Sequence, residues 1–176
     1  MPVLPIGAIV VLLVIGIALV VLYITNAGSG ARKVANVSCD TGEQLAVHYH
    51  AHLEILYQGN EVNVPANIGI QSDCFYWLHT HDTTGVIHIE APSAQAHHTF
   101  TLGDFFHVWD QPLSKTQVGT LKLAPDQQMV IYVDGTKQPD GTDPRTIGLH
   151  AHTQVVIEIT PPVVDQPPSY TFPQGL

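Results

Sequence analysis

The chain has 176 residues, so beyond its apolar start there is room for about one domain of ordinary size. Fifteen acidic residues against six Lys and Arg give a formal net charge of -9, and the basic residues form no stripe. Because phosphate binding needs clustered cations, this composition excludes nucleic acid as an expected partner. Histidine is the unusual residue, with 11 copies.

The first 25 residues predict a transmembrane anchor helix. No charged side chain precedes Arg32, and residues 3–24 are almost entirely Val, Ile, Leu, Ala and Gly. As a helix with a rise of about 1.5 Å per residue, this stretch reaches across a hydrocarbon core of about 30 Å. A cleaved signal peptide is disfavoured because no basic residue stands before the apolar run. We therefore expect an uncleaved anchor over residues 1–25 and a flexible tether over residues 26–36.

The side of the membrane is predicted from conflicting signals. Arg32 and Lys33 follow the span, and the positive-inside rule would place the domain in the cytoplasm. Against this stand two cysteines without a CxxC pairing, a glycosylation sequon at residues 36–38 and a Lys-poor, acidic domain. We expect a single-pass membrane protein whose C-terminal domain is extracytoplasmic.

Residues 47–57 predict a strand, because apolar and polar side chains alternate with a period of two. One face carries Val47, Tyr49, Ala51, Leu53, Ile55 and Tyr57, and the other carries His48, His50, His52 and Glu54. Turn sequences at residues 58–60 and 134–135 predict two hairpins. Further strands are predicted at 61–64, 75–80, 85–90, 118–122, 129–133, 136–138 and 154–160.

One helix is predicted after Thr101, which can cap it together with Asp104. Its apolar residues recur at helical spacing and predict packing on a sheet: Leu102, Phe105, Phe106 and Trp109. The fold class is thus α+β, a sheet-dominated single domain over residues 37–160 with one principal helix, preceded by the transmembrane helix. Residues 161–176 hold five of the 13 prolines, which predicts an extended tail, either loose or laid over a neighbour.

Cys39 and Cys74 are the only cysteines, and in an oxidising compartment we expect a disulfide between them. The alternative is a thiolate metal ligand. A blue-copper site is disfavoured because Cys74 is not followed by the required His and Met.

The histidines form three His-x-His runs in or beside predicted strands. Residues two apart on a strand share a face with about 6.6 Å between their Cα atoms, so two imidazoles can converge on one ion. The run from His48 to His52 spans about 13 Å by the same rise, so one of its three members is expected outside the ligand sphere or at another site. The alternative to metal binding is that these runs form a solvated strand face. His97, His98 and His107 are interpreted as surface residues. The predicted metal ligands are His48, His50, His52, His79, His81, His88, Glu90, His150 and His152.

Four segments carry a resemblance to a known group of proteins: HYHAHLEILYQGNEVNVPANIGI, CFYWLHTHDTTGVIHIE, FTLGDFFHVWDQPL and LHAHTQVVIEI. They resemble an uncharacterised group of prokaryotic proteins, usually single-span and extracytoplasmic, over Val47–Thr160. The resemblance brings no established activity. It implies that the histidine pairs and the FTLGDFF helix belong to one module. A cupin is disfavoured because the acid that follows His81 is at the wrong spacing.

Imidazoles with Glu90 or Asp82 suit Cu(II), Zn, Ni or non-haem Fe, and copper is our first prediction, with zinc as the alternative. The preferred function is a membrane-anchored metal-binding protein that acts as a carrier or as an accessory subunit of a membrane complex. The alternatives are a metal-dependent enzyme with an open His-ligated site and a structural subunit of a helix-packed assembly. Expected partners are the membrane and a protein complex or second copy, contacted through the N-terminal helix and the Pro-rich tail.

Overall fold

The computed structural model describes residues 15, 17, 32–163 and 167–176. The predicted membrane anchor and most of the tether lie outside these residues, and the anchor stays a prediction. Within the described part of the chain, no helix is long and apolar enough to cross a membrane. The domain is a compact unit over Lys33–Leu176.

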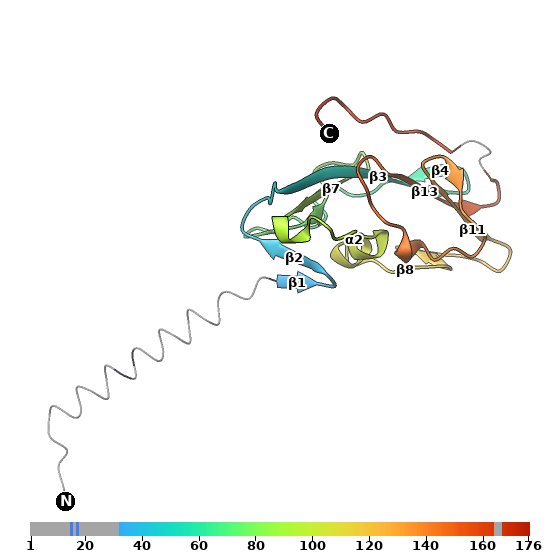
Figure 1. The fold of residues 1–176 in the computed structure, drawn as a ribbon. Helices are drawn as coiled ribbons and strands as arrows, with labels where there is room; N and C mark the ends of the chain where they lie inside the picture. Colours follow the sequence, from blue (N-terminus) through green and yellow to red (C-terminus); the bar gives the residue numbers. More distant parts are fainter. Residues whose placement is uncertain (1–14, 16, 18–31, 164–166) are drawn as a thin grey trace, which may run out of the picture. The chain divides into compact units, whose positions relative to one another are not determined.

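A seven-stranded sheet forms the centre of the domain (Figure 1). Its order is β12-β11-β13-β3-β7-β6, and β4 also pairs with β3. The central strand β3 pairs in parallel with β13 along one edge and antiparallel with β7 and then β4 along the other. The strands are β3 (Val47–Tyr57), β4 (Asn60–Val62), β6 (Leu78–His79), β7 (Val86–Ala91), β11 (Gln128–Val133), β12 (Thr136–Lys137) and β13 (Gln154–Thr160).

Both predicted hairpins are present, and the backbone conformation of their turns explains why each turn contains a glycine. Gln58 and Gly59 have φ of 51° and 78°, and Asp134 and Gly135 have φ of 50° and 73°. Two consecutive residues with positive φ form the two-residue turn that matches the twist of antiparallel strands. These turns join β3 to β4 and β11 to β12.

The helix α2 (Leu102–Val108) covers the inner face of the sheet, where Leu53 and Ile55 of β3 are buried (Figure 1). Its capping box is the predicted one, because the Thr101 hydroxyl accepts from the Asp104 backbone N–H while the Asp104 carboxylate accepts from the Thr101 backbone N–H. Gly103 allows close packing, since a Cβ there would lie 2.8 Å from the backbone oxygen of Arg145. The prediction of one principal helix against a sheet is confirmed within the described residues.

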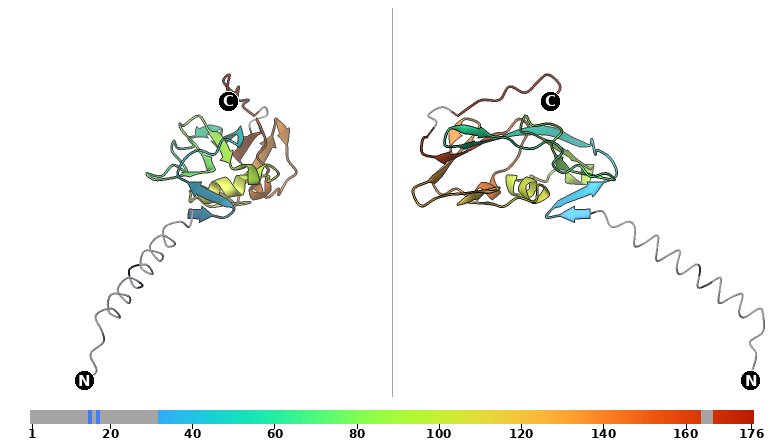
Figure 2. Two further views of the ribbon diagram at one scale, coloured as in Figure 1. Left: turned by 60° about the vertical axis from the view of Figure 1, so that its left-hand side comes forward. Right: turned by 180° about the vertical axis from the view of Figure 1, so that it is seen from behind.

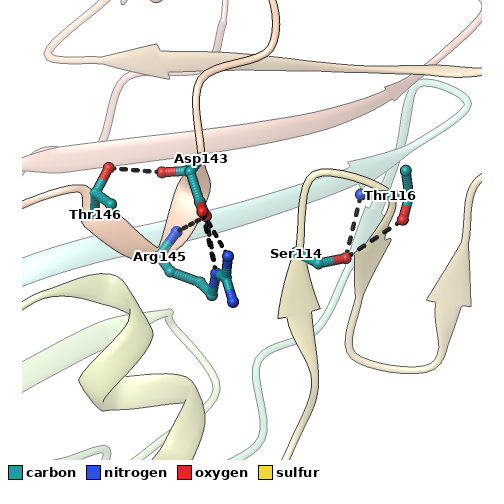
Figure 3. Close-up of polar contacts among 5 residues, drawn as sticks. All are labelled: Ser114, Thr116, Asp143, Arg145 and Thr146. Atoms are coloured by element: carbon teal, nitrogen blue, oxygen red, sulfur yellow. Dashed lines mark hydrogen bonds and ion pairs between the residues drawn. The ribbon is translucent and has the colours of Figure 1, made fainter.

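Local polar contacts shape the segments that pack beside α2 (Figure 3). Asp143 caps the 3₁₀ turn η2 (Pro144–Thr146) by accepting from the Arg145 backbone N–H, and its carboxylate also pairs with the Arg145 guanidinium. This pairing lowers the pKa of Asp143 to about 2. The Ser114 hydroxyl at the end of β8 (Leu113–Ser114) accepts from the Thr116 N–H and closes the turn toward β9.

Two smaller sheets complete the domain, and here the structure differs from the sequence prediction. The single strand predicted over residues 118–122 is instead a hairpin of two short strands, β9 and β10, because the chain turns back at residues 119–120. The predicted strand over residues 75–80 is divided between β5 in a small sheet and β6 in the main sheet. Trp77 lies at the break, where its indole N–H donates to Asp40 and its backbone N–H donates to Ser38. Part of the predicted tether is strand β1. The elements are β1 (Arg32–Val34), β2 (Val37–Asp40), β5 (Phe75–Tyr76), β9 (Gln117–Val118), β10 (Leu121–Lys122) and the 3₁₀ turn η1 (Ser93–Gln95).

Residues 167–176 lie across the outer face of the main sheet, opposite α2 (Figures 1 and 2). The Gln154 side chain exchanges two hydrogen bonds with the backbone of Tyr170, each 2.9 Å. Two tail rings stack on histidines, Tyr170 on His52 and Phe172 on His152. The described part of the Pro-rich tail therefore packs on the sheet of its own chain.

The predicted disulfide between Cys39 and Cys74 is present and joins β2 to the residue before β5. It closes a loop with a sequence separation of 35 residues. Replacing both cysteines by Ser should lower the free energy of unfolding by about 3–4 kcal/mol, because the unfolded chain regains the entropy of that loop. Urea denaturation of the wild type, with and without reductant, is the measurement. Reduced wild type should match the double variant, and equal stability of all three samples would contradict the role of the bridge.

Candidate metal centre

The register of three adjacent strands collects histidines from distant parts of the sequence. His48 lies opposite Glu90 and His50 opposite His88 in the pairing of β3 with β7, and His79 lies opposite His88 in the pairing of β6 with β7. Residues opposite one another in a sheet point to the same face. The outer face therefore carries a row of imidazoles that crosses three strands.

These side chains form two groups that share one residue. The first group consists of His79, His81, His88 and Glu90, and the second of His48, His50 and His88. In each group the ligand atoms lie within 4.8 Å of one another. The His50 and His88 ring nitrogens are 3.1 Å apart, and those of His79 and His81 are 3.3 Å apart. Two tetrahedral ligands at about 2.0–2.1 Å from an ion are about 3.4 Å apart, so little movement would be needed to hold a metal.

His79 is held in the orientation that a ligand needs. It is fully buried, and its Nδ1 lies 2.9 Å from the backbone oxygen of Tyr76. A carbonyl oxygen only accepts, so Nδ1 carries the proton and Nε2 presents its lone pair to His81. Metal-binding histidines commonly have this arrangement, since the hydrogen bond fixes both the tautomer and the ring.

Glu90 is a buried carboxylate whose hydrogen bonding is incomplete. Its Oε1 lies 3.5 Å from both His48 Nε2 and His88 Nδ1. Its Oε2 is buried and has no hydrogen-bond partner among the residues that the structure describes. A buried carboxylate oxygen without a donor is unfavourable, and a bound cation would satisfy it.

Burial favours the neutral form of three imidazoles, those of His50, His79 and His88. Desolvation, followed by repulsion from the neighbouring imidazoles, lowers the pKa of His88 to about 3 and that of His50 to about 4. Desolvation also lowers the pKa of His79 and raises the pKa of Glu90 to about 7. A neutral imidazole is the form that binds metal, so these three histidines are ready to ligate at neutral pH.

The cluster is open to solvent at its edge. The side chains of His48 and His81 are 41% and 43% exposed, whereas Glu90 is only 4% exposed. Glu43, in the loop before β3, places a carboxylate oxygen 3.7 Å from His81 Nε2. An ion can therefore reach the buried donors past His48 and His81. No motif in the sequence marked Glu43, whose contact depends on how that loop folds back.

Two local features shape the loop between His81 and β7, which leads the chain back to the cluster. Asp82 is not in either group, and its carboxylate accepts from the Thr84 backbone N–H. Gly85 has φ of 80°, and a Cβ there would meet the backbone oxygen of Leu53. Glycine is thus required where the loop passes β3.

Three of the predicted ligands lie outside both groups. His52 turns toward the Thr84 carbonyl at 2.8 Å and stacks on Tyr170. His152 stacks on Phe172, and its Nε2 lies 2.9 Å from the backbone oxygen of Leu176. His150 is exposed at the turn before β13. Six of the nine predicted residues are brought together: His48, His50, His79, His81, His88 and Glu90.

Three further histidines, His97, His98 and His107, were predicted to lie at the surface and outside the metal site. His97 and His107 are exposed, and His98 is half-buried with its ring 4.6 Å from that of Phe100. None of the three belongs to either group.

Comparisons of the chain with protein-family models, with curated proteins and with solved structures find no match. The interpretation of the cluster therefore depends on its geometry and chemistry.

The lowered pKa values predict that the metal-free protein loses stability in acid. Between about pH 6.5 and the folded pKa values of about 4 and about 3, the unfolded chain binds protons that folded His50 and His88 do not. The free energy of unfolding should therefore fall as the pH is lowered through this window. Glu90 acts in the opposite sense. Its pKa is about 7 in the folded protein and 4.5 in the unfolded chain, so its contribution to the free energy of unfolding declines as the pH rises between these two values.

Urea denaturation in the presence of a chelator, from pH 7 to pH 4, measures this dependence. His88→Gln removes one of the titrating groups and should make the pH dependence shallower, whereas His107→Gln should leave it unchanged. Identical slopes in the wild type and the His88 variant would contradict the burial argument.

Proposed function

We propose that this chain is a metal-binding protein whose cluster holds copper, with zinc as the alternative ion. The observation that supports the proposal best is the first group, in which His79, His81, His88 and Glu90 bring four ligand atoms within 4.8 Å. A solvated strand face would not explain why His79 is oriented by a carbonyl and why Glu90 Oε2 is buried without a donor.

The donor set favours copper. Imidazole nitrogens dominate the cluster, and Cu(II) binds such donors more tightly than the other divalent first-row ions. Because both cysteines are in the disulfide, thiolates do not contribute to the site. Calcium and magnesium prefer oxygen donors, of which the two groups contain only Glu90.

The proposed role is that of a carrier or an accessory subunit of a membrane complex. The exposed edge at His48 and His81 supports exchange of the ion with a partner. The disulfide and the sequon at Asn36 support an extracytoplasmic location, and the uncharged N-terminal stretch supports a single-pass anchor. Since the described tail residues pack on their own sheet, contact with a complex is assigned to the apolar N-terminal segment.

The test is metal binding by the full-length protein in detergent. The double variant His79→Gln/His88→Gln should retain less copper than the wild type after dialysis against buffer, because it removes the oriented ligand and the ligand that both groups share. The matched control, His97→Gln/His107→Gln, alters two exposed histidines outside the cluster and should retain the wild-type content. Elemental analysis measures the metal, and circular dichroism checks the fold. Equal copper in both double variants, or none in the wild type, would contradict the proposal.

A further inference from the structure

The six donors of the cluster are spread too widely to bind a single ion together. Six side chains take part, yet they divide into two groups, and only His88 belongs to both. Ligands of a single ion lie at most about 4.2 Å apart when its bonds are about 2.1 Å long. Within each group the ligand atoms lie within 4.8 Å of one another, but the six donors taken together are spread more widely than that.

The sheet itself keeps the two groups apart. His50 is on β3, His88 on β7 and His79 on β6, and these strands are neighbours in that order. Adjacent strands are about 4.8 Å apart, so the backbones of His50 and His79 are separated by about 9.6 Å. The strand pairing fixes these backbone positions, and in this arrangement the ligand atoms of His50 and His79 belong to different groups. β3 supplies the pair His48 and His50, and β6 with the residues that follow it supplies the pair His79 and His81, so each pair can hold its own ion.

The residues between the two pairs are suited to serve both. His88 has two ring nitrogens, its Nδ1 lies 3.1 Å from His50 Nε2, and its ring centroid lies 4.4 Å from that of His81. Glu90 directs Oε1 to within 3.5 Å of His48 Nε2, while Oε2 is buried without a partner. A carboxylate can bridge two cations, and Glu90 belongs to the first group while its Oε1 also lies near His48 of the second.

We propose that the cluster is a two-ion centre, with one ion held by His79 and His81, a second held by His48 and His50, and His88 and Glu90 placed between them. This inference rests on the proposed function, because it specifies how many ions the same cluster binds. The carboxylates of Glu90 and Glu43 offset the repulsion between two nearby cations. A centre of this kind presents two ions at a fixed separation, next to the solvent-exposed edge formed by His48 and His81.

The experiment titrates Cu(II) into the metal-free full-length protein in detergent and measures the copper retained per chain. The wild type should retain two equivalents. His48→Gln and His81→Gln each alter an exposed ligand of one group and should each retain one equivalent, whereas the control His97→Gln should retain two. Because both ligand positions are at the surface, these substitutions leave the core packing intact.

Electron paramagnetic resonance gives an independent readout. Two Cu(II) ions in the wild type should show spin–spin coupling, and each single variant should give the spectrum of an isolated ion. One equivalent in the wild type, or two in both single variants, would overturn the two-ion proposal and leave metal binding in place. No retained copper in the wild type would instead overturn the proposed function itself.

Discussion

The pairing register of β3, β7 and β6 is the constraint on which the candidate site depends. It sets His50 opposite His88 and His88 opposite His79, so that three short sequence motifs meet on one face. A slip of one residue would turn the even-numbered residues of β3 into the core and expose Leu53 and Ile55. The burial of those two residues against α2 therefore fixes the side on which the histidines stand.

The outer face is more enclosed than a polar strand face usually is. His50, His52 and Glu90 are all buried there, and a small apolar cluster of Leu56, Val130, Tyr132 and Val156 lies on the same face. The tail contributes to this enclosure through the stacking of Tyr170 on His52. Low exposure explains why the pKa values of His50 and His88 are lowered and why the pKa of Glu90 is raised. The same features that weaken the metal-free fold in acid prepare it to take up a cation.

Local sequence patterns predicted most of the elements. The alternation over residues 47–57 gave strand β3, the turn at Gln58 and Gly59 gave its hairpin, and Thr101 with Asp104 gave the start of α2. In each case the determining contacts lie within a few residues. The division of residues 75–80 into two strands was missed because it depends on hydrogen bonds from Trp77 to Asp40 and Ser38, far away in the sequence.

Which histidines belong to the site was harder to predict, because this also depends on contacts between residues far apart in the sequence. The pairs His79/His81 and His150/His152 have the same spacing, yet the first joins the cluster and His152 of the second contacts the tail. Spacing reports which residues share a strand face, whereas membership depends on which strands are neighbours. Glu43 carried no signal, because its approach to His81 follows from the path of a loop.

The most direct test of the account is the nitrogen spectrum of the imidazole rings when Zn(II) is added to the ¹⁵N-labelled protein in detergent. Zinc is diamagnetic, so each ligating nitrogen can be identified by its change in shift. The account predicts changes at the rings of His48, His50, His79, His81 and His88, and none at those of His97 and His107. Changes confined to exposed histidines outside the two groups would contradict it.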